Sequence, residues 1–212
     1  MFKYDAISPP VSGWLEISLD TEVIDYLWKV IHASRFPGLN VKGSLAGNIS
    51  KSTGLKDTDD WFLNNVLKDC VENYKKEFPF TIRKPDTISD RNIALDGFWV
   101  NHQRKHEFNP AHDHSGAYSF VIWMKIPTES KEQHSLPFLQ DVGQPCASNF
   151  DLTYIDTTGT IYPYPYFMDP DKEGKMLFFP STFKHCVYPF YVSDEERISI
   201  SGNIFYLSLI HI

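Results

Sequence analysis

Two histidines, His112 and His114, stand one residue apart in the run NPAHDHSGAYSFVIW, directly before a strongly apolar segment. On an extended chain, residues i and i+2 project from the same face, so both imidazoles can converge on one point while Asp113 points away. Neutral imidazoles are common ligands of transition metals. The spacing suits a metal site, but taken alone a structural or solvent-exposed loop explains the pair better.

A third ligand would come from the segment KMLFFPSTFKHCVYPF, which places His185 at a turn between two apolar runs. Its apolar neighbours equally suit a buried core histidine with a satisfied ring. If His185 faces inward, we expect the adjacent Cys186 to pack behind the strand.

Twelve residues beyond His185, Arg197 opens the run ERISISGNIF, where polar and apolar residues alternate. The polar positions are Arg197, Ser199, Ser201 and Asn203. Such alternation ordinarily indicates a strand with one face in water. Here, however, an arginine followed by a hydroxyl suits a small dicarboxylate, because guanidinium and carboxylate pair through two parallel hydrogen bonds.

Short β-type runs with turn signals between them fill the chain from residue 93 onward and must position these groups. The expected strands are Ile93–Asn101, Ala117–Ile126, Phe150–Tyr154, Thr160–Tyr162, Lys175–Pro180, His185–Tyr191 and Arg197–Tyr206. This pattern predicts an antiparallel sandwich or barrel. Tyr118, Trp123 and Phe179 are candidate walls of a site and suit the core equally well, and the run YPYPY at 162–166 is expected to be a rigid loop. Four other histidines, His102, His106, His134 and His211, are expected at the surface or in loops.

The chain before residue 93 has mainly helical patterns. After a strand near Val11–Leu19, Asp20 or Thr21 is expected to cap a helix that continues to about Ala33. A second helix is expected from Thr58 or Asp59 to about Phe78, with apolar residues at fourfold spacing. The polar, glycine-containing segment between them is expected to be a long loop that closes over something.

Length and composition exclude several classes of protein. A chain of 212 residues predicts one domain, 1–212, with a support region at 1–92 and a β-rich core at 93–212. The net charge of −7, without a basic stripe, disfavours nucleic acid as a partner. Three widely spaced cysteines indicate a reduced, intracellular protein. Without a signal peptide or a run of about 18 apolar residues, we expect a cytoplasmic protein that does not enter membranes.

Taken together, HxH before a strand, a later lone histidine and Arg-x-Ser resemble the Fe(II)/2-oxoglutarate-dependent dioxygenases. More closely, FPSTFKHCVYPFYVSDEERISISGN and the stretch from WVN to NPAHDHSGAYSFVIW are similar to a branch of 2OG-Fe(II) oxygenases found in marine phages and bacteria. The similarity covers most of the chain and is strongest between Asp96 and Tyr206. It implies an α+β protein whose β-rich core is a double-stranded β-helix (jelly-roll, cupin-like) with N-terminal supporting helices.

The resemblance also implies roles and cofactors. His112, His114 and His185 become the catalytic metal ligands, Arg197 and Ser199 the partners of the 2-oxoglutarate C5 carboxylate, and Asn101 a further contact to 2-oxoglutarate or substrate. Fe(II), 2-oxoglutarate and O2, with ascorbate as an auxiliary reductant, would support hydroxylation of a small molecule or a peptide side chain, releasing succinate and CO2. The cytoplasm would then be that of an infected host cell if the source is a phage.

The sequence departs from the family pattern at His114, which stands where the family carries Asp or Glu. Three histidines can still hold Fe(II); alternatively, His114 is the first ligand and a halide fills the carboxylate position, or the iron has been lost. Two rival functions stay open: a non-catalytic cupin-like binding or virion structural module, and a three-histidine metalloenzyme that uses no 2-oxoglutarate. A homodimer is also left open.

Overall fold

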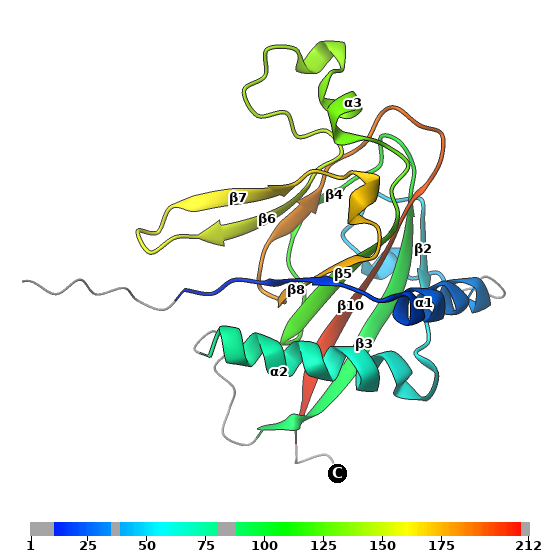
Figure 1. Ribbon diagram of the computed structural model, residues 1–212, viewed down its shortest axis with the longest axis vertical. Helices are drawn as coiled ribbons and strands as arrows, with labels where there is room; N and C mark the ends of the chain where they lie inside the picture. The colour runs from blue at the N-terminus through cyan, green and yellow to red at the C-terminus, as the bar shows by residue number, and fades with distance from the viewer. Residues whose placement is uncertain (1–10, 35–38, 80–87, 209–212) are drawn as a thin grey trace, which may run out of the picture.

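Two antiparallel sheets face each other in the computed structural model, which describes residues 11–34, 39–79 and 88–208 (Figure 1). The larger sheet has the strand order β1-β8-β5-β10-β3-β2, and the smaller has the order β4-β9-β6-β7. The larger contains β1 (Leu15–Ser18), β2 (Lys51–Gly54), β3 (Ile88–Gln103), β5 (Tyr118–Lys125), β8 (Lys175–Pro180) and β10 (Arg197–Ser208). The smaller contains β4 (Asn109–His112), β6 (Phe150–Ile155), β7 (Ile161–Tyr166) and β9 (His185–Val187).

Two helices cover the outer face of the larger sheet (Figure 1). Helix α1 (Thr21–Ala33) begins at Asp20, whose side chain accepts a hydrogen bond from the Val23 amide at 3.0 Å. Helix α2 (Lys68–Glu77) follows a 3-10 turn, η2 (Thr58–Asp60), and a π-helical turn, η3 (Leu63–Leu67). The remaining short elements are η1 (Lys42–Ser44), α3 (Ser130–His134), η4 (Pro137–Leu139) and η5 (Pro170–Lys172).

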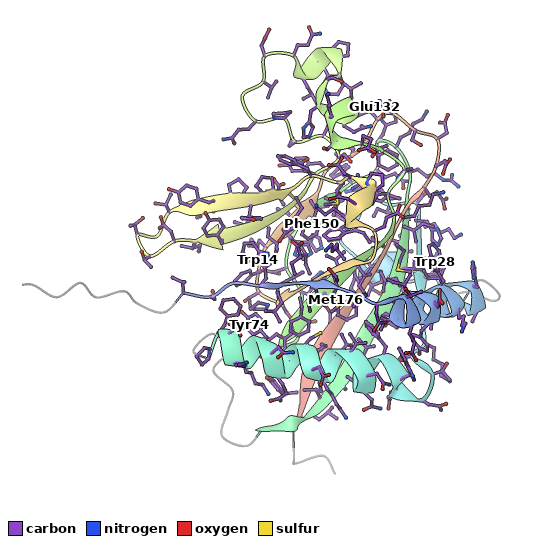
Figure 2. All side chains as sticks on the ribbon, in the orientation of Figure 1. Trp14, Trp28, Tyr74, Glu132, Phe150 and Met176 are labelled. Atoms are coloured by element: carbon purple, nitrogen blue, oxygen red, sulfur yellow. The ribbon has the colours of Figure 1, made fainter. Side chains whose placement is uncertain are left out.

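The main hydrophobic core lies between these helices and the larger sheet. Leu27 and Ile31 of α1 and Tyr74 of α2 are buried there together with Phe120 and Ile200 of the sheet. Tyr74 is labelled in Figure 2. Because side chains alternate along a strand, the isoleucines of β10 enter this core and its polar residues face the smaller sheet. The alternation expected from the sequence therefore directs the polar side of β10 into the molecule.

A second hydrophobic cluster holds the two sheets together at one side. It contains residues of both sheets, among them Trp123, Phe179, Phe150 and Leu152. Phe150 lies between the sheets (Figure 2). Beside this cluster, polar and aromatic side chains of both sheets line the cavity described below.

The predicted double-stranded β-helix core with N-terminal supporting helices is confirmed, whereas several element boundaries differ. The YPYPY run is not a loop but most of β7, an edge strand, where proline is tolerated because one row of backbone groups has no partner strand. Strands β2 and β4 and helix α3 did not stand out in the sequence, because each is only four or five residues long. Among the described residues, no helix is long and apolar enough to cross a membrane.

Candidate metal and 2-oxoglutarate site

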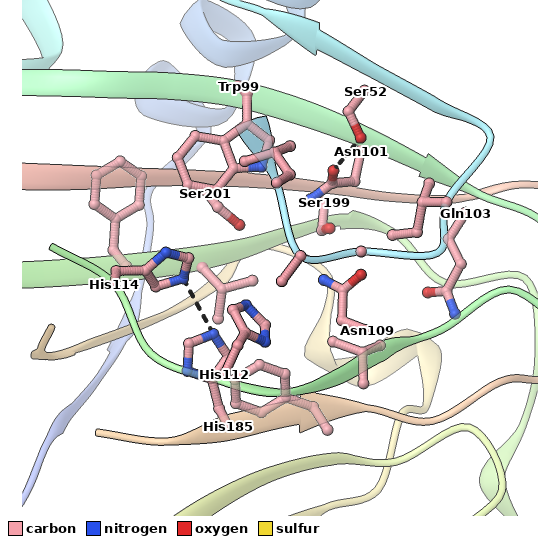
Figure 3. Close-up of a pocket in the computed structure, with 18 of the residues that line it drawn as sticks. Ser52, Trp99, Asn101, Gln103, Asn109, His112, His114, His185, Ser199 and Ser201 are labelled. Carbon is pink, nitrogen blue, oxygen red and sulfur yellow. Dashed lines mark hydrogen bonds between the residues drawn. The ribbon is translucent and has the colours of Figure 1, made fainter. Parts of the chain in front are cut away.

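Three histidines converge between the sheets. His112 ends β4 and His185 begins β9, and their Cα atoms are register partners in the smaller sheet. His114 lies in the turn before β5, where its amide donates to the Ser181 carbonyl at 2.9 Å. One ring nitrogen from each histidine lies within 4.8 Å of those of the other two. His112 and His114 therefore point toward the same place, as expected from their spacing, and His185 joins them there (Figure 3).

The orientation of the rings suits a metal. The Nε2 atoms of His114 and His185 are 3.3 Å apart, and a metal bound at about 2.1 Å separates adjacent ligand nitrogens by about 3.0 to 3.4 Å. His185 Nδ1 lies 3.1 Å from the Phe183 carbonyl, and His112 Nδ1 lies 2.7 Å from the Pro110 carbonyl. A carbonyl that accepts from Nδ1–H leaves the lone pair on Nε2, the arrangement common for histidine ligands.

Burial keeps two of the imidazoles neutral. Burial, together with charge on His112, lowers the pKa of His185 to about 3 and that of His114 to about 4. Both rings are therefore neutral near pH 7, the protonation state that binds a metal. No carboxylate of the described residues joins the cluster. Asp113 is exposed and forms an ion pair with Lys184 at 3.4 Å.

Arg197, at the start of β10, is the most unusual charged group among the described residues. The side chain is almost fully buried, with 2% of the residue exposed. Its Nη2 donates to the Ser148 carbonyl at 3.0 Å and to the Ser148 hydroxyl at 2.5 Å, while Nε and Nη1 have no hydrogen-bond partner in the described part of the chain. Burial lowers the pKa of Arg197 to about 9, so the guanidinium is still a cation at neutral pH. A buried cation with free donors fits an anionic ligand.

One cavity of about 210 Å³ connects the three histidines with Arg197. It is lined by all six residues expected from the sequence: His112, His114, His185, Arg197, Ser199 and Asn101. Asn101 of β3 is the register partner of Ser199, and its Oδ1 accepts from the Ser52 hydroxyl at 2.7 Å (Figure 3). Trp123 and Phe179 also line the cavity, as expected, and the loop between α1 and β2 contributes Ser44–Gly47 and Ile49.

Of the three candidate wall residues, Tyr118 belongs to the core, and one histidine expected at the surface or in a loop is buried. Tyr118 points into the helix-covered core, where its ring contacts Tyr74 and Phe178, because it has the opposite strand phase to Ser119 and Val121. His102, expected at the surface or in a loop together with His106, His134 and His211, is buried on β3 and lies 3.0 Å from Glu196. His211 lies outside the described residues.

Sequence reasoning missed Ser148, Ser52 and Asn109. Ser148 meets Arg197 although 49 residues separate them, and it lies in an irregular segment. Asn109 lines the cavity, and its Oδ1 is buried without a hydrogen-bond partner in the described structure. These residue types are common in loops, so nothing in their local sequence distinguishes them.

The comparisons with known proteins agree with this geometry. A family model described as "Putative 2OG-Fe(II) oxygenase" matches residues 97–203, which is half of the chain. The chain belongs to this family of 2-oxoglutarate- and Fe(II)-dependent oxygenases. The family implies Fe(II), 2-oxoglutarate and O2 as cofactor and co-substrates. No curated protein matches the chain.

One solved structure shows the fold. A prolyl-4-hydroxylase from Pseudomonas putida superposes with a TM-score of 0.52 at 13% identity, covering 93% of each chain, and at this identity the likeness concerns the fold alone. A viral collagen prolyl hydroxylase from Paramecium Bursaria Chlorella virus-1, solved with 2-oxoglutarate, has a TM-score of 0.49 at 12% identity, covering 90% of this chain and 94% of the other.

Proposed function

We propose that this oxygenase is a hydroxylase in which His112, His114 and His185 hold Fe(II) and Arg197 binds the distal carboxylate of 2-oxoglutarate. The observation that carries the proposal is the buried Arg197 cation, whose Nε and Nη1 lack partners among the described residues, in the cavity that also contains the three histidines. Leaving such donors unsatisfied is costly, and a dicarboxylate whose other end reaches the metal would satisfy them.

Each residue has a task in this proposal. The histidines offer three Nε2 ligands, and Ser199 donates its hydroxyl to the carboxylate bound by Arg197. Asn101, held by Ser52, contacts 2-oxoglutarate or the substrate. Fe(II) with 2-oxoglutarate supplies the activation of O2 that oxidises a C–H bond, with succinate and CO2 as co-products. Trp123 and Phe179 keep water from one side of the cavity.

The three-histidine arrangement is favoured over one in which His112 is not a ligand. The Pro110 carbonyl orients the His112 ring so that Nε2 carries the free lone pair, and the three donor atoms form one group. Without a carboxylate ligand, the protein contributes no negative charge to the metal, so we expect weaker Fe(II) binding than at a two-histidine, one-carboxylate site. The proposed substrate is a small molecule or a peptide side chain.

Metal content, an anaerobic titration with 2-oxoglutarate and a turnover assay test this function. We expect elemental analysis to find about one Fe(II) per chain, and His185→Ala to lose that iron. In air, the wild type should form succinate from 2-oxoglutarate only when iron is present. His106→Ala is the matched control, because His106 is exposed and does not line the cavity. A non-catalytic binding module would instead hold substoichiometric iron that does not depend on His185. Wild-type protein that binds neither iron nor 2-oxoglutarate would refute the proposal.

A further inference from the structure

Ser148 holds Arg197 through one nitrogen of the guanidinium. Both acceptor groups of this residue, its carbonyl and its hydroxyl, accept hydrogen bonds from the Nη2 atom of Arg197. Ser148 is completely buried and does not line the cavity. We propose that Ser148 is a positioning residue, which acts through Arg197 to set the affinity for the distal carboxylate of 2-oxoglutarate. The inference rests on the proposed function and adds a residue to it.

The backbone of Ser148 has an uncommon conformation for a residue with a side chain. Its φ is 71°, in the left-handed region that favours glycine. Residues in such regions persist where the surrounding structure holds them, and they cluster at functional sites. Here the conformation places the carbonyl and the hydroxyl of one residue at the same guanidinium nitrogen.

Contacts that do not involve the Ser148 hydroxyl hold this turn in place. The Ser148 amide donates to the Pro189 carbonyl at 2.8 Å, and the Tyr188 amide donates to the Asn149 carbonyl at 2.8 Å. On the other side, His134 Nε2 lies 3.1 Å from both the Ala147 carbonyl and Asn149 Oδ1. Deleting the hydroxyl should therefore leave the turn intact.

The two hydrogen bonds decide which donors of Arg197 remain for a ligand. Nη2 carries two N–H groups, and Ser148 accepts from this nitrogen twice. The Phe190 ring lies 5.2 Å from the guanidinium carbon and further restricts the group. Only Nε and Nη1 are left unpartnered in the described structure. The guanidinium is thus oriented before the ligand arrives, which lowers the entropy lost on binding.

The neutrality of Ser148 is as important as its position. A carboxylate here would pair with Arg197, cancel its charge and compete with the ligand. A hydroxyl and a carbonyl satisfy one nitrogen without adding negative charge, so the cation stays available to a dicarboxylate. Within the described residues, no Asp or Glu forms an ion pair with Arg197.

The test compares two ligands that differ only at the distal end. Dissociation constants for 2-oxoglutarate and 2-oxopentanoate, which has a methyl group in place of the distal carboxylate, are measured anaerobically by calorimetry on Fe(II)-loaded protein. The variants are Ser148→Ala and Ser148→Gly; glycine accepts the positive φ, so this second variant keeps the fold if alanine strains it. Ser119→Ala is the control, because Ser119 is buried and hydrogen-bonded but lies outside the cavity.

Loss of one hydrogen bond to a charged group predicts that both Ser148 variants bind 2-oxoglutarate about tenfold more weakly. The affinity of both variants for 2-oxopentanoate should stay within about twofold of wild type, since only the distal carboxylate of 2-oxoglutarate contacts Arg197. Ser119→Ala should leave the affinity for both ligands unchanged. If both variants keep the wild-type preference for 2-oxoglutarate, or lose affinity for both ligands equally, Ser148 is not a positioning residue. If the wild type itself does not prefer 2-oxoglutarate, the proposed function fails first and the inference with it.

Discussion

Replacing Arg197 by methionine should separate ligand affinity from stability. Nε and Nη1 are buried and have no partner among the described residues. Their N–H groups point in different directions in the planar guanidinium, so one carboxylate accepts from one of these two nitrogens. Losing one charge-assisted hydrogen bond costs about 1.5 to 3 kcal/mol of binding free energy. The dissociation constant for 2-oxoglutarate should therefore rise at least about tenfold.

The free energy of unfolding of the ligand-free protein should change little. Arg197→Met removes the two hydrogen bonds to Ser148, worth about 1.5 to 3 kcal/mol each because the donor is charged. It also removes a buried cation whose desolvation costs several kcal/mol. Because these two effects have opposite signs and similar sizes, we expect a stability close to that of the wild type.

Urea denaturation without ligand, and thermal denaturation with and without 2-oxoglutarate, measure both effects. At a ligand concentration of 100 times the wild-type dissociation constant, binding stabilises the wild type by about 2.7 kcal/mol, and this gain should fall to about 1.4 kcal/mol or less in Arg197→Met. Arg197→Lys separates charge from shape, because lysine keeps the cation without the planar fork. The reasoning is refuted if Arg197→Met is destabilised by several kcal/mol yet binds 2-oxoglutarate as the wild type does.

Three further outcomes are expected. His185→Ala should lose Fe(II) in an equilibrium dialysis against a metal buffer while His106→Ala retains it; equal retention would remove His185 from the site. Gly202→Ala should lower stability by about 1 to 3 kcal/mol in urea, because an added Cβ would lie 2.6 Å from the Phe120 ring, and an unchanged midpoint would show that the sheet can relax. Burial raises the pKa of Cys70 to about 12, so this thiol should resist a thiol reagent at pH 8 in the native protein and react only after unfolding; rapid native labelling at Cys70 would contradict its burial.

Local patterns were sufficient where one physical rule governs the chain. The cap at Asp20 and the apolar face of α1 predicted a helix that the structure contains from Thr21 to Ala33. The alternation in β10 predicted that Arg197 and Ser199 share a face, and they do line one cavity. Period-two patterns carry this information because each residue of a strand has only two directions in which to point.

Other features depend on partners that are distant in the sequence. The alternation alone does not say whether the polar face of β10 is exposed to water or lines a cavity. It lines a cavity because the smaller sheet covers it. Ser148 reaches Arg197 only because its turn is held by the segment around Pro189. Whether Tyr118 faces the site or the core could not be predicted for the same reason: a strand that is buried on both faces gives no internal signal of which side faces the helices. A residue-by-residue pattern cannot supply such contacts.

The most direct test of the account is the coupling between iron and 2-oxoglutarate. If the three histidines and Arg197 form one site, Fe(II) must raise the affinity for 2-oxoglutarate, and 2-oxoglutarate must raise the affinity for Fe(II) by the same factor. We expect both titrations, done anaerobically, to show this reciprocity in the wild type. His185→Ala should abolish the coupling. Arg197→Met should weaken 2-oxoglutarate binding but should still bind Fe(II) when no 2-oxoglutarate is present. Independent binding of the two ligands in the wild type would contradict the central claim.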